Sequence, residues 1–202
     1  MSSVMEPFVF AVQNAVLDLF ESVEQLSDEE AEKETLRKNA EKTVLRFIAA
    51  IILADGKYRD GERALVAQLV DWTAKPGGEH RYLNEYAARW TETSTQIPRF
   101  FDAAVKFDIK RQTNIARAML RNIQLIGNNV SACDGKCGET GRRMVRDYLR
   151  LLDEFHDSMK VSCRHACKEL PDGTRSDAAA YDEDLGQRAK QIAEEIKGRA
   201  GP

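Results

Sequence analysis

Two expected helices meet at Ile51-Ile52-Leu53-Ala54-Asp55-Gly56-Lys57-Tyr58-Arg59-Asp60-Gly61-Glu62. The first is an apolar run of helical periodicity. It stops at Asp55-Gly56-Lys57, and glycine is the residue that most often ends a helix. An amphipathic run starts again near Asp60. A degenerate copy of this unit follows at Val130-Ser131-Ala132-Cys133-Asp134-Gly135-Lys136-Cys137-Gly138-Glu139. The sequence therefore predicts a helix–Asp-Gly–helix unit that is used twice.

The other segments also carry apolar residues at the three-to-four residue spacing of amphipathic helices. Period-two alternation, which is typical of strands, is nearly absent. We therefore expect an all-α fold. It should be a single globular bundle of about seven to nine helices that contains the two pseudo-repeated helix–Asp-Gly–helix units.

Three segments are expected along the chain. Residues 1–27 should form an N-terminal amphipathic helix on the core, residues 28–169 the main helical domain, and residues 170–202 a linker and a C-terminal helix. Ser27 followed by Glu30 predicts a capping box that opens the second helix. A long helix with one continuous apolar face is expected from about Arg111.

The composition indicates an ordinary helical protein, with 43% hydrophobic and 31% charged residues. A net charge of -3 gives no general attraction to nucleic acid, so no nucleic-acid partner is expected. No apolar run approaches the roughly 20 residues that span a bilayer, so direct membrane insertion is not expected. We expect a cytoplasmic protein whose terminal helices offer a surface for homo-oligomerisation.

The aspartates of the two turns need an explanation, because the end of a helix already carries partial negative charge. Asp55 could accept hydrogen bonds from the amides that open the next helix, and spacing alone favours this structural role. Alternatively, Asp55 with Asp60 and Glu62 nearby could supply hard oxygen ligands to a divalent cation. An EF-hand is excluded, because Lys57 and Arg59 occupy ligand positions of that loop.

The two turns carry a resemblance to a known family. Ala54-Asp55-Gly56-Lys57-Tyr58 with Glu62, and the matching Ala132-Cys133-Asp134-Gly135-Lys136-Cys137, resemble the two Asp-Gly turns of the TerB-like (tellurite-resistance TerB) family. Ile97-Pro98-Arg99-Phe100-Phe101 and Lys106-Phe107-Asp108 resemble the segment that precedes the second turn. The likeness covers residues from about Glu30 to Met159.

The resemblance implies a non-enzymatic bacterial module of stress or tellurite-resistance assemblies, with an ATPase or a membrane-associated complex as protein partner. It also implies an acidic site for calcium or manganese at the turns. The second copy departs from the pattern, since Gly141 stands where the first has Glu62, although Glu139 is close. The residues of this acidic site would be Asp55, Glu62, Asp134 and Glu139.

The cysteines offer an alternative site, because all four lie in one stretch as two pairs with three-residue gaps. Four thiolates could bind zinc or act in redox chemistry. Buried structural thiols explain them more simply, since cysteine is among the most buried residue types. The residues are Cys133, Cys137, Cys163 and Cys167.

No catalytic constellation is recognisable, so an enzyme is not expected. The histidines beside the cysteines, His156 and His165, are interpreted as incidental surface residues. Arg142, Arg143, Arg146 and Arg150 form a basic stripe at helical spacing. We expect a solvated face paired with neighbouring acids such as Asp153, and binding of a phosphate or an acidic partner is the minority interpretation.

Overall fold

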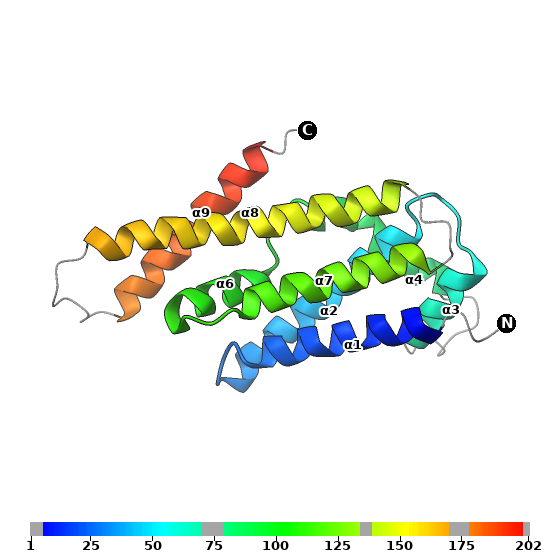
Figure 1. Ribbon diagram of the computed structural model, residues 1–202, viewed down its shortest axis with the longest axis horizontal. Coiled ribbons are helices and arrows are strands. Elements are labelled where there is room, and N and C mark those ends of the chain that lie inside the picture. Colours follow the sequence, from blue (N-terminus) through cyan, green and yellow to red (C-terminus); the bar gives the residue numbers. More distant parts are fainter. Residues whose placement is uncertain (1–5, 70–78, 134–138, 170–177, 200–202) are drawn as a thin grey trace.

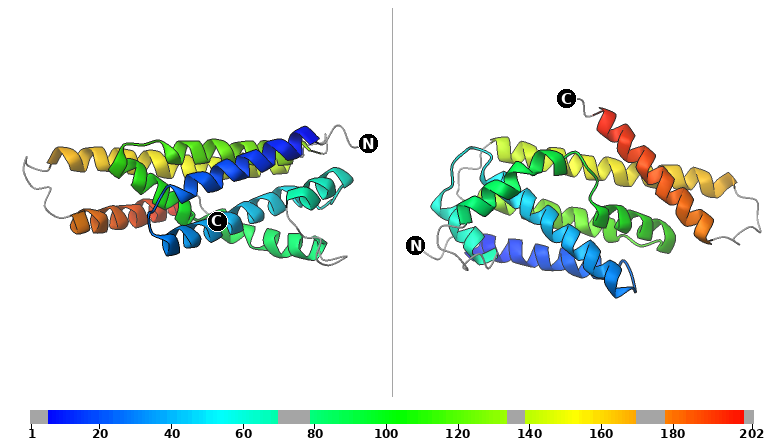
Figure 2. Two further views of the ribbon diagram at one scale, coloured as in Figure 1. Left: turned by 90° about the horizontal axis from the view of Figure 1, so that it is seen from below. Right: turned by 180° about the vertical axis from the view of Figure 1, so that it is seen from behind.

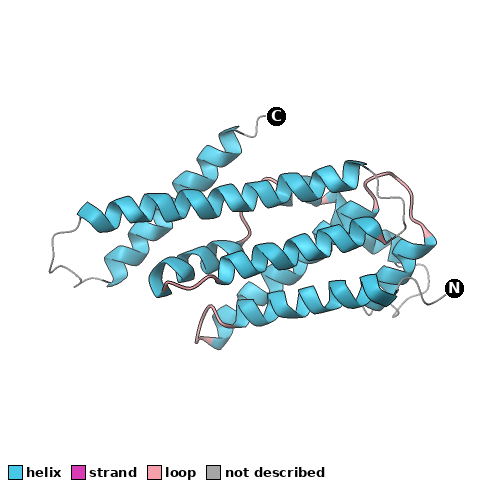
Figure 3. Cartoon of the chain, in the orientation of Figure 1, coloured by secondary structure: helices cyan, strands magenta, loops and turns pink. Residues whose placement is uncertain are grey.

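The computed structural model of the chain describes residues 6–69, 79–133, 139–169 and 178–199 (Figure 1). Within these ranges the chain forms nine helices and no strand, so the predicted all-α fold is confirmed (Figure 3). The helices are α1 (Glu6–Glu24), α2 (Glu30–Ile52), α3 (Asp60–Leu69), α4 (Glu79–Ala88), α5 (Trp90–Thr93), α6 (Arg99–Arg111), α7 (Ile115–Ala132), α8 (Glu139–Glu169) and α9 (Ala178–Arg199).

The helices are arranged in two layers, which are seen edge-on in the left view of Figure 2. Helices α1, α7 and α8 lie side by side in one layer (Figure 1), and α7 packs against both of its neighbours. Helix α2 crosses behind them and contacts α1, α7, α8, α4 and α6. The buried half of α2 therefore forms the centre of the core.

The centre of the core is an aromatic cluster from three helices. Phe47 of α2 lies 5.2 Å from Trp90 of α5 and 5.4 Å from Tyr148 of α8, measured between ring centroids. The Trp90 and Tyr148 rings meet edge to face at 4.8 Å. Aromatic pairs at these separations add to the energy of area burial, so the cluster joins segments that are far apart in the sequence.

Helices α7 and α8 approach closely at Gly127. A Cβ at this position would lie 2.8 Å from Cγ1 of Val145 and 2.9 Å from Cζ of Phe47. Real Cβ atoms are essentially never this close to another heavy atom. Glycine is therefore favoured at this position because a side chain would collide with Val145 and Phe47, and not because of its backbone conformation.

The predicted long helix from about Arg111 is wrong at its start, because Arg111 ends α6 and α7 begins at Ile115. Gln112 between them adopts a left-handed conformation with φ of 57°, which stops α6. The buried side chain of Asp108, which reaches across from α6, then caps α7. Its carboxylate accepts hydrogen bonds from the amides of Ile115 at 2.8 Å and Ala116 at 2.9 Å.

The capping box predicted at Ser27 and Glu30 is also wrong in detail. Glu30 is the first residue of α2, and Glu29 occupies the N-cap position without a side-chain cap bond. The Ser27 hydroxyl instead accepts the amide of Glu29 at 3.1 Å and donates to Glu32 at 2.7 Å. Ser27 therefore still organises the entry to α2, but from two residues further upstream.

Both terminal helices pack against the bundle. Helix α1 buries Val12 and Leu19 completely and lies along α7, while α9 crosses α8 obliquely (Figure 1). The residues of α9 that it buries are Leu185, Ala189, Ile192 and Ile196. Among the described helices, none is both long enough and apolar enough to cross a membrane.

Candidate functional site

The first Asp-Gly turn connects α2 to α3, and both of its predicted acids accept local hydrogen bonds. Asp55 Oδ1 accepts the amide of Lys57 at 2.9 Å, and Gly56 follows with a φ of 72°. Glu62 is buried in the first turn of α3, where its Oε2 accepts the amide of Arg59 at 2.8 Å. That is the bond a capping-box glutamate makes to the N-cap residue. Glu62 therefore caps α3. The expected capping of α3 by Asp55 is wrong, because its backbone partner Lys57 lies within the turn, before α3 begins at Asp60.

Arg59 brings the two carboxylates of the turn together. Its guanidinium forms an ion pair with Asp55 and lies 4.0 Å from Glu62 Oε1. The amide of Lys57, aided by Arg59, holds the pKa of Asp55 below its ordinary value. Since both acids face Arg59, the protein's own guanidinium stands between the carboxylates that a bound cation would use.

The two helix ends that flank the second turn lie at the same end of the bundle as the first turn. A Cβ on Gly141 would lie 3.6 Å from Cγ2 of Ile51 and 3.8 Å from Oγ of Ser131, so the ends of α2 and α7 meet the start of α8. Glu139 is exposed, 3.5 Å from Arg146. Asp134 and Cys137, predicted as ligands here, lie outside the described residues.

The two cysteines whose side chains the structure describes lie far apart. Cys133 lies at the end of α7, beside the start of α8, and Cys163 lies far along α8. Both are buried and neither is in a disulfide. Gly141 and Cys163 are separated by about 33 Å of helix, so one zinc ion, with Zn–S bonds of about 2.3 Å, cannot bind both thiolates. Cys133 and Cys163 therefore do not share one zinc site. Cys137 and the side chain of Cys167 lie outside the described part of the chain.

A group of metal-ligand residues lies instead on α8. Asp153, His156 and Asp157 each place one potential ligand atom within 4.8 Å of the others. Their spacing of three and four residues puts them on adjacent turns of one helix face. Imidazole Nδ1 of His156 lies 2.9 Å from Oδ1 of Asp157. We name these three residues the α8 cluster.

Arg117 of α7 holds the two carboxylates of the α8 cluster. Its guanidinium is bonded to Asp153 through Nη1 and to Asp157 through Nη2, the latter at 2.8 Å. The carboxylates are partly exposed, whereas His156 is 1% exposed. The cluster therefore sits at the boundary between core and surface, with an arginine as its present counter-ion.

The interpretation of His156 as a surface histidine is wrong, because the ring is buried. Burial lowers the pKa of His156, and the contact with Asp157 opposes the shift. The imidazole is therefore neutral near pH 7, the form in which histidine binds metals. Nε2 is buried and has no hydrogen-bond partner among the described residues. When Nδ1 binds a cation, the single ring proton resides on Nε2.

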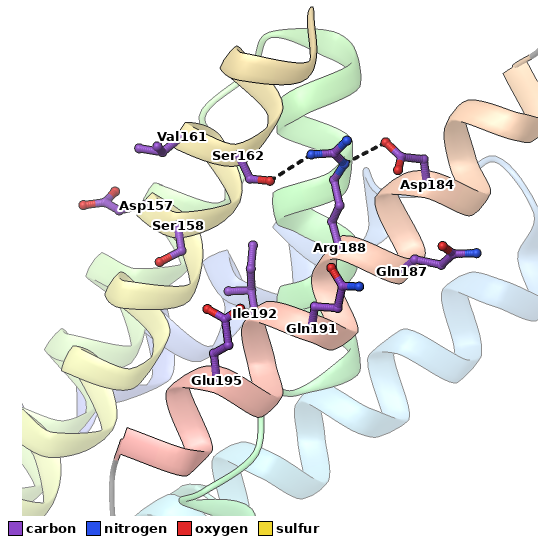
Figure 4. Close-up of a pocket in the computed structure, with 10 residues that line it drawn as sticks. All are labelled: Asp157, Ser158, Val161, Ser162, Asp184, Gln187, Arg188, Gln191, Ile192 and Glu195. Carbon is purple, nitrogen blue, oxygen red and sulfur yellow. Dashed lines mark hydrogen bonds and ion pairs between the residues drawn. The ribbon is translucent and has the colours of Figure 1, made fainter.

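Two open grooves flank the α8 cluster. One, of about 650 Å³, lies between α8 and α9 (Figure 4). In it Arg188 of α9 donates to Ser162 of α8 at 3.1 Å and to Asp184 of its own helix at 2.7 Å. The other, of about 560 Å³, lies between α7 and α8 and contains Arg117 and Asp153.

The α8 cluster could have been found only in part from the sequence. An Asp-x-x-His-Asp pattern on a predicted helix places three ligands on one face, and this signal is present at Asp153, His156 and Asp157. The burial of His156 and the pairing with Arg117, which lies on another helix, depend on tertiary packing. No local pattern indicates either of them.

Comparison of the chain with family models, with curated proteins and with solved structures returned no match. The TerB-like resemblance is therefore carried by the quoted sequence motifs alone. It stays a prediction.

Proposed function

We propose that this chain is a non-enzymatic helical module that binds one divalent cation at the α8 cluster and holds a protein partner. The observation that supports the cation site is the group of three ligand atoms within 4.8 Å of one another. Ligands around an ion with bonds of about 2.1 Å lie up to about 4.2 Å apart, so the cluster needs only a small contraction to close on a metal.

The donor set determines which cation fits. Imidazole nitrogen favours zinc and related ions, and carboxylate oxygen favours manganese, magnesium and calcium. One imidazole with two carboxylates therefore suits Zn²⁺ or Mn²⁺ better than Ca²⁺. Arg117 would have to leave the two carboxylates when the cation binds, because its guanidinium is now paired with one oxygen of each.

Calorimetric titration with Mn²⁺ and Zn²⁺ tests this site. We expect one site per chain, and Asp153→Asn or Asp157→Asn should weaken binding by at least about tenfold because an anionic ligand is lost. Mn²⁺ is the more informative probe, because Zn²⁺ could also bind to the cysteine thiolates of the chain, which have little affinity for Mn²⁺. Arg117→Gln should strengthen binding roughly three- to tenfold, because a competing ion pair is removed.

Asp147→Asn is the matched control for these variants. It makes the same charge change on the same helix, and Asp147 pairs with Arg150 rather than with the cluster. Equal Mn²⁺ affinity in Asp147→Asn and Asp153→Asn would rule out the α8 cluster. Weaker binding in Arg117→Gln would also contradict it, since Arg117 would then be needed for the site.

The turn at Asp55 and Glu62 is the second candidate cation site, supported by the convergence of both acids on Arg59. Arg59→Gln is expected to raise Mn²⁺ or Ca²⁺ affinity there several-fold, because the resident positive charge is removed. Asp55→Asn should abolish the gain when added to Arg59→Gln. Affinity that is unchanged in Arg59→Gln, or in Asp55→Asn by itself, would leave these acids with their hydrogen bonds to the turn and the start of α3 as their only role.

The biological setting that we propose follows the TerB-like resemblance. It is a cytoplasmic bacterial assembly of the stress or tellurite-resistance type, in which the partner is an ATPase or a membrane-associated complex. The support is the pair of turn motifs in the sequence, together with the helix ends that flank them, since α2, α7 and α8 meet at Ile51, Ser131 and Gly141. Tellurite sensitivity of a strain that lacks the protein, restored by the wild type, tests this setting.

A further inference from the structure

The groove between α7 and α8 has an excess of positive charge. Three guanidinium groups and one carboxylate line it, and that carboxylate, Asp153, is already paired with Arg117. Arg121 has no ion pair among the described residues, and the contact of Arg150 with Asp147 is long, at 3.6 Å. The lining residues are Arg117, Leu120, Arg121, Gln124, Leu149, Arg150 and Asp153.

The groove also offers apolar contact and amide donors. Leu120 and Leu149 contribute apolar surface from the two helices, and Gln124 adds a side-chain amide. The basic surface continues along α8, since Arg146 and Arg142 precede Arg150 at four-residue spacing and are exposed. The surface is therefore a strip that follows the two helices, with two leucines between its charges.

We propose that this strip docks an acidic segment of a protein partner. Carboxylates of the segment would meet Arg121 and Arg150, whose guanidinium groups suit bidentate binding of carboxylate. An apolar side chain of the segment would rest on Leu120 and Leu149. An inorganic anion has no apolar group that could pack against these two leucines.

A nucleic acid fits the strip less well than an acidic peptide. Its closely spaced phosphates would meet the carboxylates of Asp147, Asp153 and Asp157, which stand among the arginines. A peptide can instead place single acids opposite single arginines. This docking strip rests on the proposed partner-binding function and does not depend on cation binding at the α8 cluster.

The test is a fluorescence-anisotropy titration of the full chain with a labelled peptide of glutamates in which every third or fourth residue is leucine. Two further peptides replace all glutamates by glutamine or all leucines by serine. We expect the glutamine peptide to bind at least tenfold more weakly. The serine peptide should bind several-fold more weakly. Raising the salt should weaken binding of the original peptide, because the charges are exposed.

The protein variants locate the site. Arg121→Gln and Arg150→Gln should each weaken binding three- to tenfold, and together by more than either alone. Arg199→Gln makes the same charge change on the exposed end of α9 and should leave the affinity unchanged. Circular dichroism melts of all three variants should coincide with the wild type, since the replaced side chains are exposed.

Three results would overturn the proposal. One is an equal loss of affinity in Arg199→Gln and Arg121→Gln, which would indicate charge attraction without a site. Another is equal binding of the glutamate and glutamine peptides. The third is tighter binding of a labelled ten-residue oligothymidine than of the glutamate peptide, with the same loss in Arg121→Gln, which would assign the strip to nucleic acid.

Discussion

Replacing Asp108 with alanine is expected to lower the free energy of unfolding by about 3 kcal/mol, because a buried anionic cap is lost. Asp108 is 2% exposed, and its carboxylate accepts hydrogen bonds from the amides of Ile115 and Ala116 and from the hydroxyl of Thr113. Alanine leaves these donors without their partner at the start of α7. For a chain of this size the melting temperature should fall by roughly 6–12 °C.

Two further variants make this result specific to the cap. Asp108→Asn keeps one carbonyl oxygen as acceptor, so its free energy of unfolding should lie between those of Asp108→Ala and the wild type. Asp182→Ala removes a surface carboxylate paired with Lys110 at 2.5 Å, and such pairs contribute about 0–1 kcal/mol. Chemical denaturation measures all three. A loss in Asp108→Ala no larger than in Asp182→Ala would contradict the assigned role.

Gly127→Ala is expected to destabilise the protein by about 2 kcal/mol, although alanine is the better helix former. The added methyl group would lie 2.8 Å from Val145 and 2.9 Å from Phe47, which forces α7 away from α8 and α2. Gly186→Ala on α9 is the matched control, because a Cβ there meets no atom within 4 Å. That variant should instead stabilise the protein by about 0.5–1 kcal/mol.

The clash can be separated from a general effect on α7 by a double-mutant cycle with Val145→Ala. By itself this change leaves a cavity and should also cost stability, by about 1–2 kcal/mol. Combined with Gly127→Ala it provides the space that the new methyl group needs. The loss of stability in the double variant should therefore be smaller than the sum of the two single losses by at least about 1 kcal/mol. Strict additivity would show that the two residues do not collide.

The all-α fold was predictable from the sequence because the three-to-four residue spacing of apolar residues is a local signal for helices. The boundary between α6 and α7 could not be predicted in this way. It depends on the left-handed conformation of Gln112 and on Asp108, whose carboxylate caps a helix that begins seven residues later. Glutamine carries no strong signal for a helix end. The predicted helix therefore started near Arg111, where a helix in fact ends.

The candidate sites were predictable to different degrees. At the first turn, the sequence indicated that Asp55 and Glu62 lie close together, but it could not show that Asp55 would accept the amide of Lys57 instead of one in α3. It also could not show that Arg59 would contact both acids. On α8, His156 gave no local sign of burial. The cysteines were close in sequence, but a straight helix places Cys163 far from Cys133 because its length grows with every residue.

The packing of α1 has a consequence for synthesis of the chain. Its main neighbour, α7, ends about 100 residues after α1 does, so the two cannot meet until α7 has emerged from the ribosome. At about 5–20 residues per second, α1 is without that neighbour for roughly 5–20 s. During this interval the face that carries Val12 and Leu19, fully buried in the finished bundle, stays available to chaperones.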